Sequence, residues 1–282
     1  MVRQIINTLF TGMFFCLSMI GKGQEKAPVG KLFYDTRVVN GQSVEMSNEG
    51  VMKFIIGHRF GRINSGAYEL FGIDNSTIRL GFDYGVKKWL NIGIGRNSFE
   101  KTYDGFVKLR LLEQSHDTPL SLVYHASMAF RTLRTPPGLP EEPTENRLYY
   151  THQLLAARKI SDRLSLQLMP TFVHRNLVET DEVKNDVLAM GSAFRFMVTK
   201  RFTLSSEYYY VLPNQLADQY TNSLTLGFNI ETKGHVFQFH LGNSRGMVEK
   251  FFVTETTGDW TKGDIHFGFN ITRDFKLKGR KY

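Results

Sequence analysis

The chain has 282 residues, is rich in Phe (23), Tyr (12) and Gly (25), and has a slightly negative mean hydropathy. No apolar run reaches the ~20 residues that a membrane-spanning helix needs, which excludes a bundle of such helices. A transmembrane β-barrel is not excluded, because only alternate residues of its strands have to be apolar. The formal net charge of +8 is compatible with nucleic acid. Because no nucleic-acid-binding motif is present, no such partner is expected, and anionic lipid head groups are the expected counter-charge.

Residues 1–23 have the pattern of a cleaved secretory signal peptide. Arg3 provides the positive charge, residues 5–20 are apolar, and small glycines precede the expected cleavage site after Gly23. The only cysteine, Cys16, lies in this segment, so the mature chain is expected to have no disulfide. Export, the lack of cysteines and of a spanning helix, and the many alternating strands described below together predict a protein of the Gram-negative outer membrane.

Residues 24–50 are polar and carry an Asn40-Gly41 turn signal, which predicts a periplasmic N-terminal segment that folds under or into a barrel. From residue 51 onward, apolar and polar residues alternate with the period of a β-strand. In the clearest pair of segments, 76–84 and 90–98, one face is apolar and the other is polar or small. The predicted strands are 51–60, 76–84, 90–98, 103–112, 120–131, 148–158, 164–175, 187–199, 202–211, 223–231, 235–243 and 264–273.

The connections between these segments alternate between short and long, and only the link near residues 100–102 breaks the pattern. Short periplasmic turns and long external loops are typical of bacterial outer-membrane barrels. The sequence therefore predicts an all-β, closed antiparallel up-and-down barrel of about 12 strands (about 10–14) over residues 51–275, with a periplasmic tail at 276–282. A β-sandwich is the alternative fold, and it leaves the alternation of loop lengths unexplained.

The alternation places most charged strand residues opposite the apolar row, on the face that would line the lumen. The candidate lumen-lining residues are Lys53, Arg59, Arg79, Asp83, Lys108, Arg110, His125, Arg195, Glu207, His240 and His266. One interpretation of this mostly basic set is a pore or binding channel that favours anions. The other is an ion-paired interior that fills a narrow barrel. The three histidines come from separate strands, so neither a metal site nor a cofactor is predicted.

Arg96, Lys101 and Arg131 are predicted near the outer rim, where lipopolysaccharide phosphates would be suitable partners. Solvated rim charges are the alternative interpretation. The first long loop, residues 61–72, is interpreted either as packing against the neighbouring strands or as a constriction. Outer-membrane lipids and the barrel-assembly machinery complete the expected partners.

An outer-membrane lipid hydrolase would need a serine nucleophile beside a histidine base and an orienting polar group. Ser98, Ser127 and Ser206 are present, as are His152 and His174, but no Gly-x-Ser-x-Gly motif accompanies them. The chain is therefore not predicted to be an enzyme.

Specific motifs resemble an uncharacterised family of outer-membrane β-barrels, a domain of unknown function. The resemblance runs from residue 37 to the C-terminus and is densest before residue 106. The motifs are Arg37–Gly41, Gly57–Gly61, Gly66–Asp74, Leu80–Gly85 and Gly93–Gly105. The resemblance implies a barrel in the outer membrane and implies no activity.

The expected function is that of a passive channel or binding barrel for small polar or anionic solutes. A closed structural or assembly-partner barrel without conductance is the first alternative, and the lipid hydrolase is the second.

Overall fold

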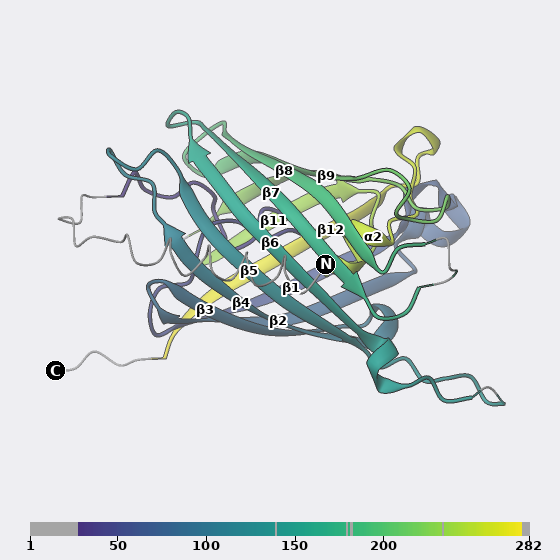
Figure 1. Cartoon of the computed structure of the whole chain (residues 1–282). Coiled ribbons are helices and arrows are strands. Elements are labelled where there is room, and N and C mark those ends of the chain that lie inside the picture. The colour runs from purple at the N-terminus through teal and green to yellow at the C-terminus, as the bar shows by residue number, and fades with distance from the viewer. Residues whose placement is uncertain (1–27, 139, 179, 181–182, 233, 278–282) are drawn as a thin grey trace.

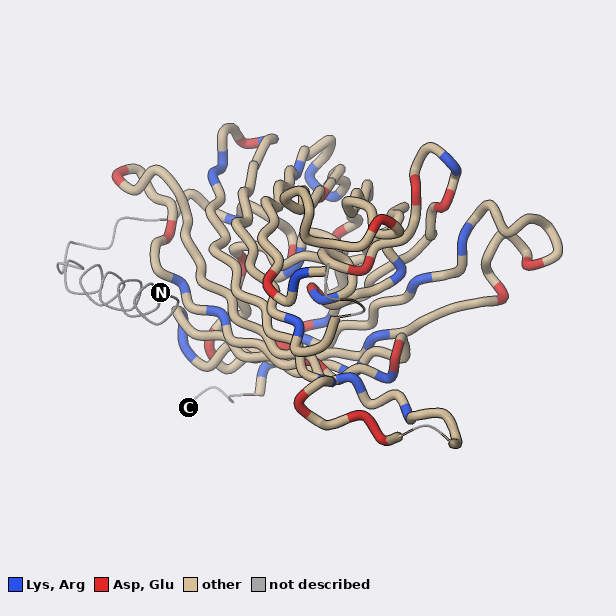
Figure 2. The backbone as a smooth tube through the Cα atoms, turned by 45° about the vertical axis from the view of Figure 1, so that its right-hand side comes forward, with Lys and Arg blue, Asp and Glu red and all other residues tan. Residues whose placement is uncertain are grey.

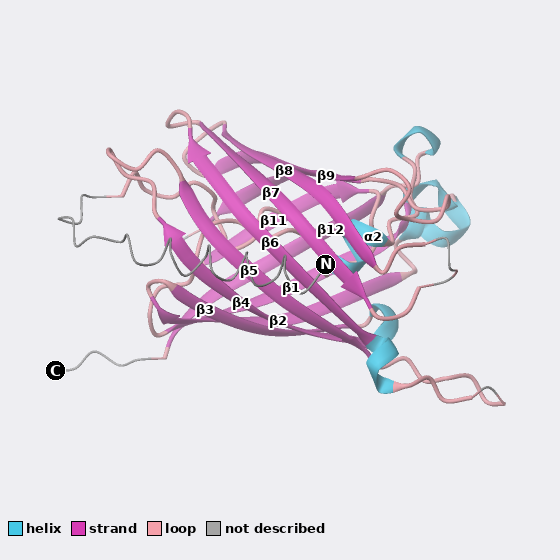
Figure 3. Ribbon diagram, in the orientation of Figure 1, coloured by secondary structure: helices cyan, strands magenta, loops and turns pink. Residues whose placement is uncertain are grey.

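The computed structural model describes residues 28–277 except 139, 179, 181, 182 and 233, so the predicted signal peptide lies outside the described residues. Twelve antiparallel strands form a closed barrel, in which each strand pairs with the next and β12 pairs with β1 (Figures 1 and 3). The predicted fold class and the predicted strand number are both confirmed.

The strands keep the predicted positions and differ from the prediction by a few residues at their ends. They are β1 (Val51–Arg62), β2 (Ser76–Lys87), β3 (Leu90–Asn97), β4 (Thr102–Leu112), β5 (Ser121–Arg131), β6 (Leu148–Lys159), β7 (Leu164–Arg175), β8 (Asp186–Met197), β9 (Phe202–Val211), β10 (Ser223–Glu231), β11 (His235–Gly242) and β12 (His266–Lys276). The connections contain α2 (Glu249–Thr254) and the 3-10 turns η1 (Ile63–Ser65), η2 (Ala67–Gly72), η3 (Phe99–Lys101), η4 (Thr144–Arg147) and η5 (Trp260–Lys262).

The two ends of the barrel differ in their connections. The start of β1 and the end of β12 lie at one end, together with the shorter connections, and we call it the turn end. The opposite end, called the loop end, carries the long connections, the short link between β3 and β4, and α2 (Figure 1). Among the described residues, no helix is long and apolar enough to cross a membrane.

The outer face of the barrel is an apolar belt, as the alternation predicts. Ile94 on β3 and Leu168 on β7 are 61% and 55% exposed, whereas their inward neighbours are largely buried. A closed sheet leaves no strand edge without hydrogen-bond partners, which is the condition for placing strands in hydrocarbon. Lys, Arg, Asp and Glu occur along the strands as well as in the loops (Figure 2).

The inner wall has two chemically different halves. From β10 through β12 and β1 to β4 it is mainly polar, whereas from β5 to β9 it carries a large apolar surface. The apolar wall residues are Val123, Leu155, Ala157, Met169, Val173, Val187, Ala189, Ala193, Tyr209 and Val211. Strand β6 shows why its alternation is weak in the sequence: Leu154 faces outward and Leu155 is completely buried inside.

A charge placed on the outer belt should destabilise the barrel, because hydrocarbon does not solvate it. Leu226 of β10 is 45% exposed on the belt. We expect Leu226→Arg to lower the free energy of unfolding by about 2–4 kcal/mol. Urea titration of the protein in lipid vesicles measures this change. Tyr68→Arg, at a loop position that is 94% exposed, is the matched control and should have little effect.

Candidate functional site: the filled lumen

Two segments of the chain fill the lumen. Residues 28–50, the plug segment, enter at the turn end and appear in purple inside the barrel in Figure 1. Residues 243–265, the inserted loop between β11 and β12, carry α2 at the loop end, and all six residues of α2 are buried. The interior is therefore a packed core rather than an open channel in this structure.

The apolar half of the wall packs against the apolar residues of the plug segment. Leu32, Phe33, Val38, Val39 and Val44 form one buried cluster with the wall of β5–β9 and with two residues of α2. Burial of aliphatic and aromatic side chains is worth about 1.5–3 kcal/mol each. This cluster makes the plug segment an integral part of the barrel core.

The predicted turn at Asn40-Gly41 forms and surrounds a wall carboxylate. Val38 N–H donates to the carbonyl oxygen of Gly41 at 2.8 Å. Glu207 of β9 accepts hydrogen bonds from the backbone N–H groups of Val39 (3.3 Å), Asn40 (2.8 Å) and Gly41 (3.0 Å). A side chain at residue 41 would collide with the buried side chain of Tyr209, since its Cβ would overlap the hydroxyl oxygen. Glycine is therefore required at the tip of this turn.

The polar half of the wall binds the opposite side of the same turn. Arg59, 2% exposed, donates to Asn40 Oδ1 at 2.6 Å. The amide of Asn270 donates to the carbonyl oxygen of Val39 at 2.9 Å, and that of Gln238 to the carbonyl oxygen of Val38 at 3.0 Å. Wall side chains thus satisfy backbone groups that have no strand partner.

Other predicted lumen residues also hold the plug segment. Asp83 accepts from Thr36 Oγ1 at 2.9 Å and from Arg37 at 3.2 Å. Lys108 donates to two plug carbonyl oxygens, at 3.1 and 2.9 Å. Arg195 donates to the carbonyl oxygen of Leu32 at 2.7 Å. The charges on these side chains are directed at the plug rather than at open water.

Among the described residues, Arg79 and the three histidines of the predicted lumen set make no hydrogen bond to the plug segment. Arg79 forms a buried ion pair with Asp104. His125 lies 3.9 Å from Glu249 of α2, and His266 Nδ1 lies 2.8 Å from the carbonyl oxygen of Phe60. The remaining histidine of the set is His240, which is 3% exposed on β11. Within the described part of the chain, no group of three or more His, Cys, Asp or Glu residues could hold a metal ion.

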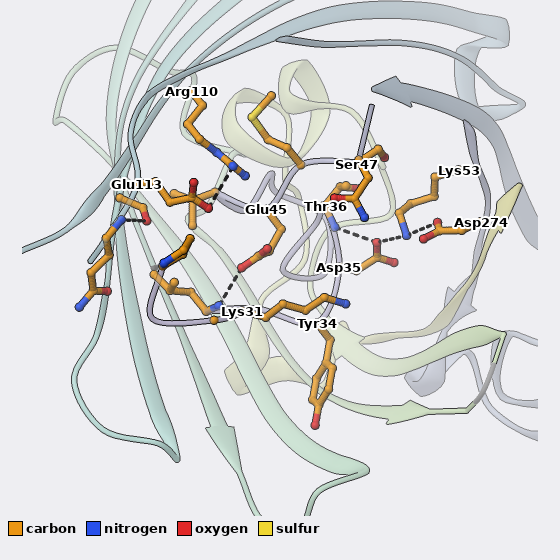
Figure 4. Close-up of a pocket in the computed structure, with 18 residues that line it drawn as sticks. Lys31, Tyr34, Asp35, Thr36, Glu45, Ser47, Lys53, Arg110, Glu113 and Asp274 are labelled. Atoms are coloured by element: carbon orange, nitrogen blue, oxygen red, sulfur yellow. Dashed lines mark hydrogen bonds and ion pairs between the residues drawn. The ribbon is translucent and has the colours of Figure 1, made fainter. Parts of the chain in front are cut away.

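A cavity of about 270 Å³ lies between the plug segment and the wall at the turn end (Figure 4). Five of its charged side chains form ion pairs within the structure. Lys53 binds Asp35 at 2.9 Å and Asp274 at 2.7 Å, and Arg110 binds Glu113 at 3.1 Å. These pairs indicate a structural role for the cavity lining.

The surroundings shift the pKa values of two buried carboxyl groups of the plug segment in opposite directions. Burial raises the pKa of Asp35, but the Lys53 ammonium and the hydrogen bonds to the carboxylate outweigh it, so the pKa is lowered. Burial dominates at Glu45 and raises its pKa, although Glu45 accepts the N–H groups of Leu32 (2.7 Å) and Phe33 (3.2 Å). The ion pair therefore fixes Asp35 as a charged anchor of the plug.

The inserted loop has a buried anchor, Lys250, that is not among the residues predicted from the sequence. Lys250 of α2 is 2% exposed, and its ammonium binds Glu100 at 3.2 Å and Glu255 at 2.9 Å. It also lies 4.1 Å from the centre of the Tyr149 ring, a cation–π contact. The Phe251-Phe252-Val253 run was the available signal, because such a run is unexpected in a loop that faces water.

The three predicted rim residues lie near the loop end. Arg96 faces outward on β3, 5.2 Å from the Tyr103 ring centre, and Lys101 is exposed in η3. Arg131 pairs with Glu142. Their contact with lipopolysaccharide stays a prediction.

The first long loop lies outside the barrel core. Tyr68, Leu70 and Phe71 are 94%, 52% and 55% exposed, so the predicted buried packing of this loop is wrong for these side chains. The plug segment and the inserted loop, rather than this loop, narrow the lumen.

The histidines and serines considered for a hydrolase do not come together. His174 Nδ1 lies 2.6 Å from Asp186 Oδ1, which would orient a base. Ser98 Oγ accepts from the backbone N–H of Ile78, and Ser206 is buried on β9. In the part of the chain that the structure describes, no serine hydroxyl forms a hydrogen bond with a histidine.

A closed strand barrel with an apolar outer belt and a filled interior defines a membrane-bound β-barrel protein. The chain belongs to the family described as membrane bound beta barrel domain (DUF5777), whose model matches residues 33–275. The match includes most of the plug segment as well as the barrel. No curated protein matches the chain at a significant level.

Solved structures of similar fold are porins and other membrane barrels. The NanC porin is 10% identical, with a TM-score of 0.50 over 80% of this chain and 100% of that chain. The KdgM porin is 10% identical, with a TM-score of 0.47 over 80% and 99%. Outer membrane phospholipase A from Escherichia coli is also 10% identical, with a TM-score of 0.45 over 80% and 91%. At this identity the similarity concerns the fold alone.

Loss of the Glu207 carboxylate should release the plug turn. We expect Glu207→Ala to lower the free energy of opening of the Val39, Asn40 and Gly41 amides by about 1–3 kcal/mol, the cost of an unpaired buried donor. Hydrogen–deuterium exchange of the full chain measures this change. The control is Glu141→Ala, because its side chain is 85% exposed. Unchanged protection in Glu207→Ala would contradict the assigned role of Glu207.

Proposed function

We propose that the protein is an outer-membrane β-barrel that its own plug segment keeps closed, so that it is not a constitutively open channel. The turn end then faces the periplasm and the loop end faces outward, as short turns and long loops do in bacterial barrels. The observation that carries the proposal is the single buried cluster shared by the plug segment, the wall and α2.

The charges on the wall beneath the plug support the proposal that the barrel passes or binds an anionic solute when the plug moves away. Four wall cations contact plug atoms, and two wall anions do the same. The cations are Lys53, Arg59, Lys108 and Arg195, and the anions are Asp83 and Glu207. Removal of the plug would leave a net positive wall, which favours anions.

Two alternative functions would require different structural features. A structural or assembly-partner barrel needs no movable plug and would stay non-conducting in every form. A lipid hydrolase would need a serine beside a histidine base. The pair of His174 and Asp186 supplies only a base and the carboxylate that orients it.

Planar-bilayer recording distinguishes the gated barrel from the structural one. We expect the full mature chain to give no conductance above background. A chain that lacks residues 24–50 should give discrete steps and prefer chloride over potassium. A deleted chain that folds, as judged by heat-modifiable migration on a gel, but stays silent would contradict the proposal that the plug segment alone closes the barrel. Steady conductance of the full chain would contradict the closed state.

A cysteine-accessibility experiment avoids the deletion. Val39 is 1% exposed in the plug segment, and Tyr68 is 94% exposed in the first long loop. With Cys16 replaced by Ser, we expect Val39→Cys to resist a membrane-impermeant maleimide and Tyr68→Cys to react rapidly. Equal labelling of the two folded variants would show that water reaches the plug and would contradict the proposal.

A further inference from the structure

A groove of about 420 Å³ lies on the lipid-facing wall over β6, β7 and β8. Its lining is almost entirely apolar. The outward apolar side chains that form it are Leu154, Pro170, Phe172, Leu188, Met190 and Leu212. A concave surface of this kind on a membrane barrel is open to the hydrocarbon of the bilayer rather than to water.

The groove coincides with an interruption of the sheet. Pro170 has no N–H and is therefore unable to donate the ladder hydrogen bond expected at its position in β7. The pairing of β6 with β7 passes from Gln153 opposite Thr171 directly to Ala156 opposite Leu168. The ladder between β6 and β7 thus lacks regular pairing at Leu154 and Pro170, at the centre of the groove, whereas Pro170 stays paired with Met190 of β8.

One polar pair faces this apolar surface. Tyr124 Oη and His152 Nδ1 share a hydrogen bond of 2.7 Å, and the His152 ring stacks near Phe172 at 6.2 Å between ring centres. Over the described ranges, neither Tyr124 nor His152 forms another side-chain hydrogen bond. In hydrocarbon, the unused hydrogen-bonding capacity of these groups is unfavourable unless a bound molecule satisfies it.

The lining also restricts the head group of a ligand. It contains no Lys or Arg, so a phosphate or sulfate group would lack a counter-charge. The imidazole and the hydroxyl suit a small group that both donates and accepts hydrogen bonds, such as a carboxyl group. His152 pairs with Ala126 and Phe172 in the interior of β6, away from the strand ends where lipid head groups lie.

From these observations we infer that the groove is a binding site for a long-chain fatty acid. The alkyl chain lies along Leu154, Leu188 and Met190, and the carboxyl group meets the Tyr124–His152 pair. The site is separate from the plug and does not depend on whether the lumen opens.

Photolabelling of the full chain in lipid nanodiscs with a diazirine-bearing palmitic acid tests the site. We expect labelled peptides from β6, β7 and β8 around Leu154, Pro170 and Met190. Unlabelled palmitic acid should compete, whereas hexadecyl phosphate should not. Equal competition by hexadecyl phosphate, or even labelling around the whole belt, would overturn the inference.

Two variants and one control make the test specific. Leu154→Trp fills the groove and should abolish its labelling, and Leu226→Trp is the matched control at a similarly exposed belt position on β10. His152→Phe keeps the ring but removes the hydrogen bond to the ligand, and should weaken labelling about fivefold. If Leu154→Trp fails to fold, His152→Phe decides: unchanged labelling in that variant overturns the inference.

Discussion

The structure depends on one constraint: the interior of a narrow closed barrel must be filled, and its buried polar groups must be paired. Twelve strands enclose a space that side chains of the wall alone do not fill here, and the chain fills it with its own segments. A buried donor or acceptor without a partner costs about 1–3 kcal/mol. The plug turn meets this condition because wall side chains surround it on both sides, with Glu207 on one side and Asn270 on the other.

The two halves of the inner wall follow from the same constraint. Apolar residues on β5–β9 bury the valines of the plug, and amide and charged residues of both halves, such as Gln238 on β11 and Arg195 on β8, bind its backbone. These specific contacts explain why the lumen charges do not resemble the charge rings of an open pore. Most of them are directed at specific carbonyl, amide or carboxylate groups, which positions the plug as well as balancing charge.

The barrel was predictable from the sequence because apolar and polar residues alternate with a period of two in every strand that faces lipid on one side. The same alternation placed Arg59, Lys108 and Glu207 inside. It did not show what they bind, since Glu207 contacts Asn40 across 167 positions of the sequence. Nor did it locate α2, whose burial depends on a space that only the closed barrel creates. Strand β6 was hardest to read because Leu154 and Leu155 are apolar on opposite faces.

The plug turn lies inside the barrel against β9, and nuclear Overhauser contacts in the full mature chain, reconstituted in lipid nanodiscs, measure this position. We expect contacts between the α-protons of Gly41 and the ring protons of Tyr209, because these groups are in close approach. Absence of these contacts, together with random-coil chemical shifts for residues 28–50, would contradict this position of the plug turn.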